Sequence, residues 1–138
     1  MKQTIIIDTG ALVAFLQKRD FYHQWAMSQM ATIRAPLLTC EAVLTETCYL
    51  TSRTSNGMDT VLELMETGLV QVAFEIKNEF AAVRALIDRY TNVPMSFADA
   101  CLVRMSELLP DSTIFTTDSD FHIYRKHGNQ PIPLIIPH

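Results

Sequence analysis

Acidic side chains that follow strand-like runs are the residues of this chain best suited to chemistry. Asp8 comes directly after Ile5–Ile7, and Asp118 comes just after a second β-prone run over residues 112–116. Three β-branched residues in a row are typical of a strand buried on both faces of a parallel sheet. Ligands of such sheets bind beyond the carboxyl ends of the strands. We therefore expect Asp8 and Asp118 to meet at one edge if their strands are neighbours.

A third acid interrupts an apolar stripe on a predicted helix over residues 40–53. The stripe follows the helical spacing i, i+3, i+4, i+7 and contains Val43, Glu46, Thr47 and Leu50. A carboxylate inside such a stripe needs a hydrogen-bonding or charged partner, or has a functional role. The structural alternative to a functional role is a buried ion pair or a hydrogen-bonded core glutamate. Glu41 lies about 140° away around the same helix, near its N-terminus, where a carboxylate stabilises the helix dipole. We interpret Glu41 as structural and Glu46 as a candidate site residue.

Two further acids have ordinary structural explanations as well. Asp99 stands three residues after Ser96, which matches a capping box at the start of a helix. A helix start also faces the sheet edge where Asp8 is expected, so capping and a functional role are compatible. Asp120 could likewise cap a short helical turn that ends near Tyr124.

Four or five carboxylates at one edge would need neutralisation. At separations near 5 Å and an effective dielectric near 20, each pair repels by roughly 3 kcal/mol. Protons or cations must offset that repulsion. Oxygen ligands without histidine or cysteine favour Mg²⁺ or Mn²⁺ over zinc. Such clusters activate water and stabilise phosphoryl transition states.

Strands alternating with helices are predicted to position these acids. The expected strands cover residues 5–7, 35–38, 69–74, 112–116 and 133–137. The expected helices cover residues 9–17, 21–33, 40–53, 58–66, 78–90 and 96–109, with Thr39 as an N-cap and Ser55–Gly57 as a break. This alternation indicates an α/β fold with a parallel sheet and right-handed crossovers.

Length and charge narrow the class of protein. At 138 residues the chain is predicted to form one domain, residues 1–138, with a core large enough to fold without a disulfide or a structural metal. Eleven Lys and Arg against fifteen Asp and Glu give a net charge of −4. That balance argues against non-specific binding of nucleic acid through charge alone. It does not exclude an enzyme that acts on nucleic acid.

Cysteine usage and hydropathy favour a cytoplasmic location. Cys40, Cys48 and Cys101 are odd in number and have no metal-binding spacing, so we interpret them as reduced thiols. The N-terminus lacks the apolar run of a signal peptide, and no stretch reaches the eighteen or so apolar residues that cross a bilayer. We expect no membrane partner.

Four segments, taken in order, resemble the PIN domains, and in particular the VapC-like ribonuclease toxins of bacterial toxin–antitoxin systems. The segments are Ile6–Leu12, Ala42–Glu46, Pro94–Ala100 and Thr116–Phe121. Each segment alone is weakly specific, but four in this order and spacing cover nearly the whole chain. The resemblance implies a three-layer α/β/α sandwich with strand order 3-2-1-4-5, which places the Asp8 and Asp118 strands side by side.

The resemblance also implies a site and an activity. Asp8, Glu46, Asp99 and Asp118 match the metal-binding and catalytic acids of the family, and Asp120 matches an auxiliary metal ligand. Thr9 and Thr116 match positions where a small hydroxyl orients the acids; ordinary cap and strand-end roles are the alternative. The implied reaction is Mg²⁺-dependent hydrolysis of RNA phosphodiester bonds, with Mn²⁺ as a possible substitute. The implied partners are RNA, a cognate antitoxin and a second copy of the chain.

Three other functions remain to be weighed. A phosphatase that forms an aspartyl-phosphate usually has a second acid where Gly10 stands, and it needs a late lysine that we do not find. A Toprim-like domain could use Asp118 and Asp120, but its first strand should end in glutamate rather than Asp8. The non-enzyme alternative is a PIN-fold module that binds RNA or protein without cleavage; the intact acids argue against it.

Overall fold

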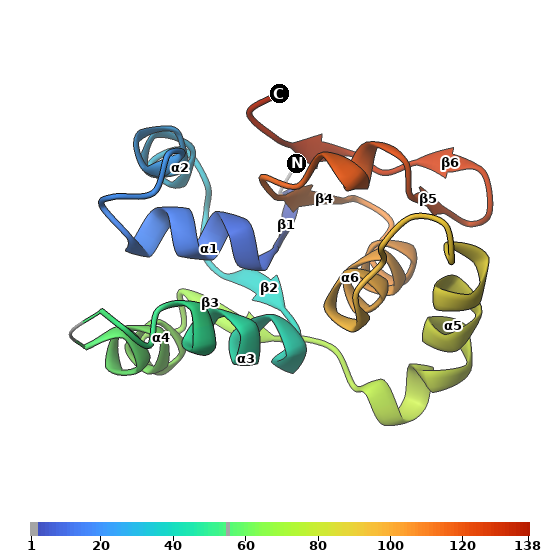
Figure 1. Ribbon diagram of the computed structural model, residues 1–138, viewed down its shortest axis with the longest axis horizontal. Helices are drawn as coiled ribbons and strands as arrows, with labels where there is room; N and C mark the ends of the chain where they lie inside the picture. The colour runs from blue at the N-terminus through green and yellow to red at the C-terminus, as the bar shows by residue number, and fades with distance from the viewer. Residues whose placement is uncertain (1–2, 55) are drawn as a thin grey trace.

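A computed structural model describes residues 3–54 and 56–138, so Ser55 of the predicted chain break lies outside the described residues (Figure 1). The strands are β1 (Thr4–Ile7), β2 (Leu37–Thr39), β3 (Val70–Val72), β4 (Ser112–Phe115), β5 (Arg125–Lys126), β6 (Gln130–Pro131) and β7 (Leu134–Ile135). The helices are α1 (Thr9–Leu16), α2 (His23–Met30), α3 (Glu41–Leu50), α4 (Gly57–Glu66), α5 (Ile76–Arg89), α6 (Phe97–Leu108) and the 3₁₀ turn η1 (Ser119–His122).

Five parallel strands form the central sheet, in the order β3-β2-β1-β4-β7. This is the predicted order, because β7 takes the place of the expected fifth strand. A short antiparallel hairpin, β5-β6, precedes β7 and forms a second sheet. Helices α5 and α6 stand together on the right of Figure 1, and α1 to α4 occupy the left. The α/β class with a central parallel sheet is therefore confirmed.

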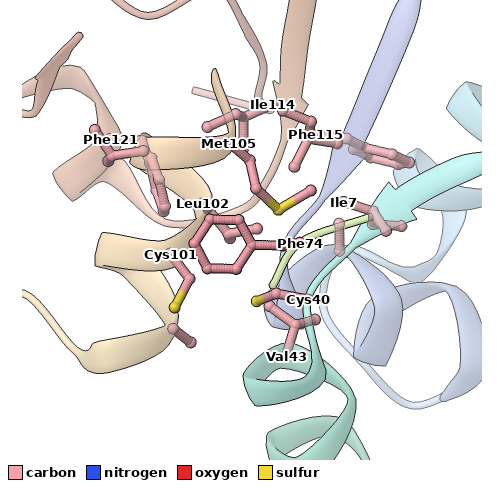
Figure 2. Packing of buried hydrophobic residues seen from close by; sticks show 14 of the residues in the cluster. Ile7, Cys40, Val43, Phe74, Cys101, Leu102, Met105, Ile114, Phe115 and Phe121 are labelled. Atoms are coloured by element: carbon pink, nitrogen blue, oxygen red, sulfur yellow. The ribbon is translucent and has the colours of Figure 1, made fainter. Parts of the chain in front are cut away.

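The two central strands carry the predicted buried runs. Ile5–Ile7 of β1 pair in parallel with Thr113–Phe115 of β4, and both stretches are buried. Figure 2 shows Ile7 and Phe115 near the end of this pair, with Met105 and Leu102 of α6 packed against the sheet. Because Ile7 is in register with Phe115, the residues that follow them emerge at the same edge. The strand pair thus positions Asp8 beside the segment that starts at Thr116.

Several predicted boundaries were wrong for local reasons. The helix expected over residues 21–33 is only His23–Met30, since Asp20 accepts a hydrogen bond from the Tyr22 backbone N–H and holds a turn there. Thr39 is not an N-cap. It ends β2, and its hydroxyl donates to the Ile7 carbonyl at 2.9 Å, while Cys40 occupies the cap position. Among the described residues, no helix is long and apolar enough to cross a membrane.

Candidate metal centre

Asp8 lies at the end of β1, buried, as the N-cap of α1. Its Oδ1 accepts the Thr9 backbone N–H at 2.7 Å, which is ordinary capping. Its Oδ2 accepts a hydrogen bond from the Thr116 hydroxyl at 2.6 Å. Both carboxylate oxygens are thus held in place, one by the helix that follows β1 and the other by the residue that follows β4.

Thr116 joins Asp8 to Asp118. The Thr116 hydroxyl oxygen accepts the Asp118 backbone N–H at 3.0 Å while its proton goes to Asp8. Asp118 in turn caps η1, because its Oδ1 accepts the Asp120 backbone N–H at 2.9 Å. The structure therefore brings Asp8 and Asp118 to one edge, as expected from their strands. Asp120 lies in the first turn beyond them, and its backbone supports Asp118.

Glu46 also lies at this edge, but its side chain is not buried as its place in the apolar stripe predicted. The side chain is exposed rather than buried, and Leu50, another member of the stripe, is 56% exposed. The argument from a buried charge was therefore wrong. Glu46 does have a specific partner, however, since its Oε1 accepts the Thr9 hydroxyl at 2.8 Å. Because Thr9 directly follows Asp8, this bond ties α3 to the strand that carries Asp8.

Asp99 occupies the first turn of α6 and forms the predicted capping box. The Ser96 backbone N–H donates to Asp99 Oδ2 at 3.3 Å, and the Asp99 N–H donates to Ser96 Oγ at 3.0 Å. The same Oδ2 lies 3.2 Å from the Tyr124 hydroxyl, which also lies 3.2 Å from the Pro94 carbonyl. Among the described residues, no donor binds Asp99 Oδ1, so this oxygen is free for another ligand.

Tyr124 is the site residue that the sequence did not reveal. It is fully buried, and burial beside Asp99 raises the pKa of its hydroxyl, which therefore stays protonated and donates. The only sequence signal was an aromatic residue with a polar tip shortly after a cluster of acids. A buried tyrosine hydroxyl usually finds a partner, but its sequence position alone could not show that the partner is Asp99.

The family model described as PIN domain matches residues 5–126. The chain belongs to the PIN domain family. The four segments quoted above all lie inside the matched residues, and they include all five acids that the resemblance singled out.

Two solved structures share this PIN fold. One is the crystal structure of Mycobacterium tuberculosis VapC20, a sarcin–ricin loop cleaving toxin, with 19% identity and a TM-score of 0.77 over 85% of this chain and 92% of that chain. The other is DNA-bound VapBC from Salmonella typhimurium, with 12% identity and a TM-score of 0.54 over 97% of this chain and 98% of that chain. At these identities the likeness concerns the fold. No curated protein sequence matches the chain significantly.

Burial raises the free energy of ionising Asp8 and Asp99. It raises the pKa of Asp8 to about 7, with the charges of Asp99 and Asp118 adding to the effect and the bond from Thr116 opposing it. Burial and the charge of Asp118 also raise the pKa of Asp99 to about 6. Both carboxyl groups therefore keep their protons to higher pH than an ordinary aspartate does, Asp8 more than Asp99, unless a cation takes the place of the proton.

The oxygen donors suit a hard divalent cation, although the side chains are not gathered into a complete coordination sphere. In the described part of the chain, no three Asp, Glu, His or Cys side chains are close enough to make a ready coordination set. The available atoms are nevertheless carboxylate oxygens oriented by the hydroxyls of Thr9 and Thr116. Oxygen donors of this kind suit Mg²⁺ or Mn²⁺, and a cation would offset the cost of ionising Asp8 and Asp99 together.

Proposed function

We propose that this PIN domain is a divalent-cation-dependent endoribonuclease, the toxin of a toxin–antitoxin pair. The observation that carries the proposal is the hydrogen-bonded link from Asp8 through Thr116 to Asp118. Glu46 is bonded to Thr9 next to Asp8, and Asp99 is near enough for its charge to raise the pKa of Asp8. Hydroxyl groups that hold carboxylates in fixed orientations are the outer support that metal sites require. The similar fold of a toxin that cleaves the sarcin–ricin loop supports RNA as the substrate.

Each site residue has a proposed role. Asp8, Asp99 and Asp118 would hold Mg²⁺, or Mn²⁺ in its place, with Glu46 and Asp120 as further candidate ligands. When bound, the cation lowers the pKa of a water molecule and neutralises charge on the phosphate. Thr116 fixes the orientation of Asp8, and Thr9 fixes that of Glu46. Tyr124 donates to one oxygen of Asp99 and directs the other toward the cation.

Incubation of the purified protein with total RNA tests the activity. We expect cleavage with Mg²⁺ or Mn²⁺, no cleavage in EDTA, and defined ends when the products are mapped. If neither cation supports cleavage while RNA still binds, the non-cleaving PIN module becomes the better description.

The proposed protein partner is an antitoxin, in line with the similar fold found in a VapBC complex. A groove of about 1110 Å³ between α3, α4 and the end of β3 offers it an apolar surface that includes Tyr49, Met58 and Leu62. These side chains are 77%, 57% and 46% exposed, and exposed apolar patches mark interaction surfaces.

A second copy of the chain is the other proposed partner, and both partners would meet the enzyme in the cytoplasm. Light scattering that shows only a monomer at high concentration would contradict the dimer.

A further inference from the structure

A second pocket adjoins the acidic edge and is not explained by metal binding. Its volume is about 380 Å³, and it lies between the N-terminal halves of α3 and α6. Glu46 and Ser96 line it, and these two residues hydrogen-bond to Thr9 and Asp99 of the candidate metal centre. A ligand in this pocket would therefore lie next to a phosphate held at the acids.

The pocket has an apolar floor and an aromatic side chain beside it. The side chains of Phe74, of Cys40 at the N-cap of α3 and of Cys101 on α6 all line the pocket, and Figure 2 shows them gathered together. Phe97, the first residue of α6, also lines it and is 47% exposed. Exposure to water does not stabilise an apolar phenylalanine ring, whereas stacking of the ring on a nucleobase does.

The charged groups of the pocket are carboxylates, which accept hydrogen bonds, and the hydroxyls of Thr45 and Ser96 lie beside them. Glu41 contributes a carboxylate that accepts no hydrogen bond within the described residues, and Glu46 contributes a second, which binds Thr9. No Lys or Arg lines the pocket among the described residues. Carboxylates accept from the amino groups of bases, as glutamate and aspartate do with the N4 amine of cytosine. A phosphate would be repelled, so an amino-bearing base fits this surface better than the RNA backbone does.

We propose that this pocket receives an unstacked base that flanks the cleaved bond and selects adenine, cytosine or guanine over uracil, whose exocyclic groups are carbonyl oxygens that a carboxylate repels. The inference rests on the proposed ribonuclease function. Phe97 would stack on the base, and Glu41 would accept from its exocyclic amine. The volume lies within the range of about 300–1,000 Å³ found for small-molecule pockets. Glu41 thus gains a role in specificity besides its favourable position in the first turn of α3.

Binding and cleavage measurements together test the proposal. Fluorescently labelled short oligo(A), oligo(C) and oligo(U) are titrated against the full chain in EDTA, where the proposed nuclease is inactive. We expect oligo(U) to bind roughly tenfold more weakly than the other two, because one favourable base contact is absent. In Mg²⁺, cleavage of a randomised single-stranded RNA should show depletion of uridine at one position beside the cut.

Two variants and two matched controls locate the effect. Phe97→Leu should weaken binding of all three oligonucleotides roughly tenfold through loss of stacking, whereas Phe80→Leu, an exposed phenylalanine of α5 outside the pocket, should not. Glu41→Gln should reduce the discrimination against oligo(U), and Glu66→Gln on α4 should leave it unchanged.

The outcomes separate this inference from the proposed function. Cleavage with no base preference, or a preference that Glu41→Gln leaves intact, overturns the pocket assignment while the ribonuclease remains. Base-selective binding without cleavage in any cation supports the pocket and overturns the nuclease. Equal effects of Phe97→Leu and Phe80→Leu also overturn the assignment, and would direct attention to a protein ligand instead.

Discussion

The hydroxyl of Thr116 links the residue that follows β1 to the segment that follows β4. It is fully buried, its proton goes to Asp8, and its oxygen accepts the N–H of Asp118. One hydroxyl therefore fixes the orientation of one proposed ligand and the backbone of another. The resemblance named Thr116 as a possible orienting residue, and the structure gives it that geometry.

We expect Thr116→Val to lower metal-dependent RNA cleavage by about 10- to 100-fold, the usual cost of removing outer support for a metal ligand. Thr116→Ser keeps the hydroxyl and should retain most of the activity. Thr113→Val is the matched control, because Thr113 lies on β4 and its hydroxyl accepts a hydrogen bond from the side-chain amide of Gln3 rather than contacting an acid. Initial rates at saturating Mg²⁺ provide the comparison, and equal rates for the two valine variants would contradict the role of Thr116.

The sequence pattern predicted where the candidate acids lie in the fold better than it predicted which residues contact them. Asp8, Asp99 and Asp118 were placed by strand ends and a helix start, which local spacing specifies well. Glu46 was chosen because of an expected burial that the structure does not show. Tyr124 was missed because its bond to Asp99 joins residues 25 positions apart, and no local pattern encodes such a contact.

At the scale of elements, the first turn of α1 lies against the segment after β4. A Cβ atom added to Gly10 would lie 2.3 Å from the Thr117 hydroxyl oxygen, far inside contact distance. The Thr117 backbone N would lie 3.8 Å away, an ordinary contact, so the restriction at Gly10 falls on the side chain of the residue that precedes Asp118. A similar restriction occurs far from the acids, where a Cβ at Gly57 would lie 2.1 Å from the Thr51 carbonyl oxygen.

These two glycines form a matched pair. Gly10→Ala should force the Thr117 side chain to turn away and lower cleavage by up to about tenfold, because Thr117 directly precedes Asp118 and catalysis is sensitive to small shifts of its groups. Gly57→Ala should instead lower the free energy of unfolding by about 1–3 kcal/mol, the typical cost of overpacking, with the activity of the folded molecules unchanged. Urea denaturation and initial rates on both variants distinguish the effects; a fully active Gly10→Ala protein would refute the close approach.

The elements that the sequence did not predict are short and polar. The β5-β6 hairpin has two residues per strand, and its turn contains His127 and Gly128, both with positive φ. Neither alternation nor an apolar run marks strands of that length. The five strands of the main sheet were predicted because each contains a short apolar run between helices, although β2 and β3 are shorter than the expected runs.

At the scale of the whole molecule, the acidic edge should make stability depend on pH and on cations. The pKa of Asp8 is about 7 in the folded protein against 3.8 as its ordinary value, so the folded state binds this proton more tightly than the unfolded chain does. Stability from this residue is fully present below pH ~4 and is lost as the pH rises toward 7. Asp99 shifts in the same direction.

We therefore expect Asp8→Asn to be more stable than the wild type at pH 8 in EDTA, by at least about 1 kcal/mol, since each unit of pKa shift corresponds to about 1.4 kcal/mol. At pH 4 the difference should become small. Mg²⁺ should raise the melting temperature of the wild type at pH 8 but not that of the variant. Chemical denaturation at both pH values provides the measurement, and a difference that does not change with pH would contradict the burial cost of Asp8.

The most direct test of the central claim compares RNA cleavage by the wild type and Asp8→Asn in Mg²⁺, with circular dichroism to establish that both are folded. We predict that the wild type cuts RNA in Mg²⁺ and not in EDTA. We predict that Asp8→Asn loses at least about 100-fold of this activity, more than an outer-support residue such as Thr116 contributes. Cleavage by folded Asp8→Asn at the wild-type rate would contradict a metal-dependent nuclease centred on this carboxylate.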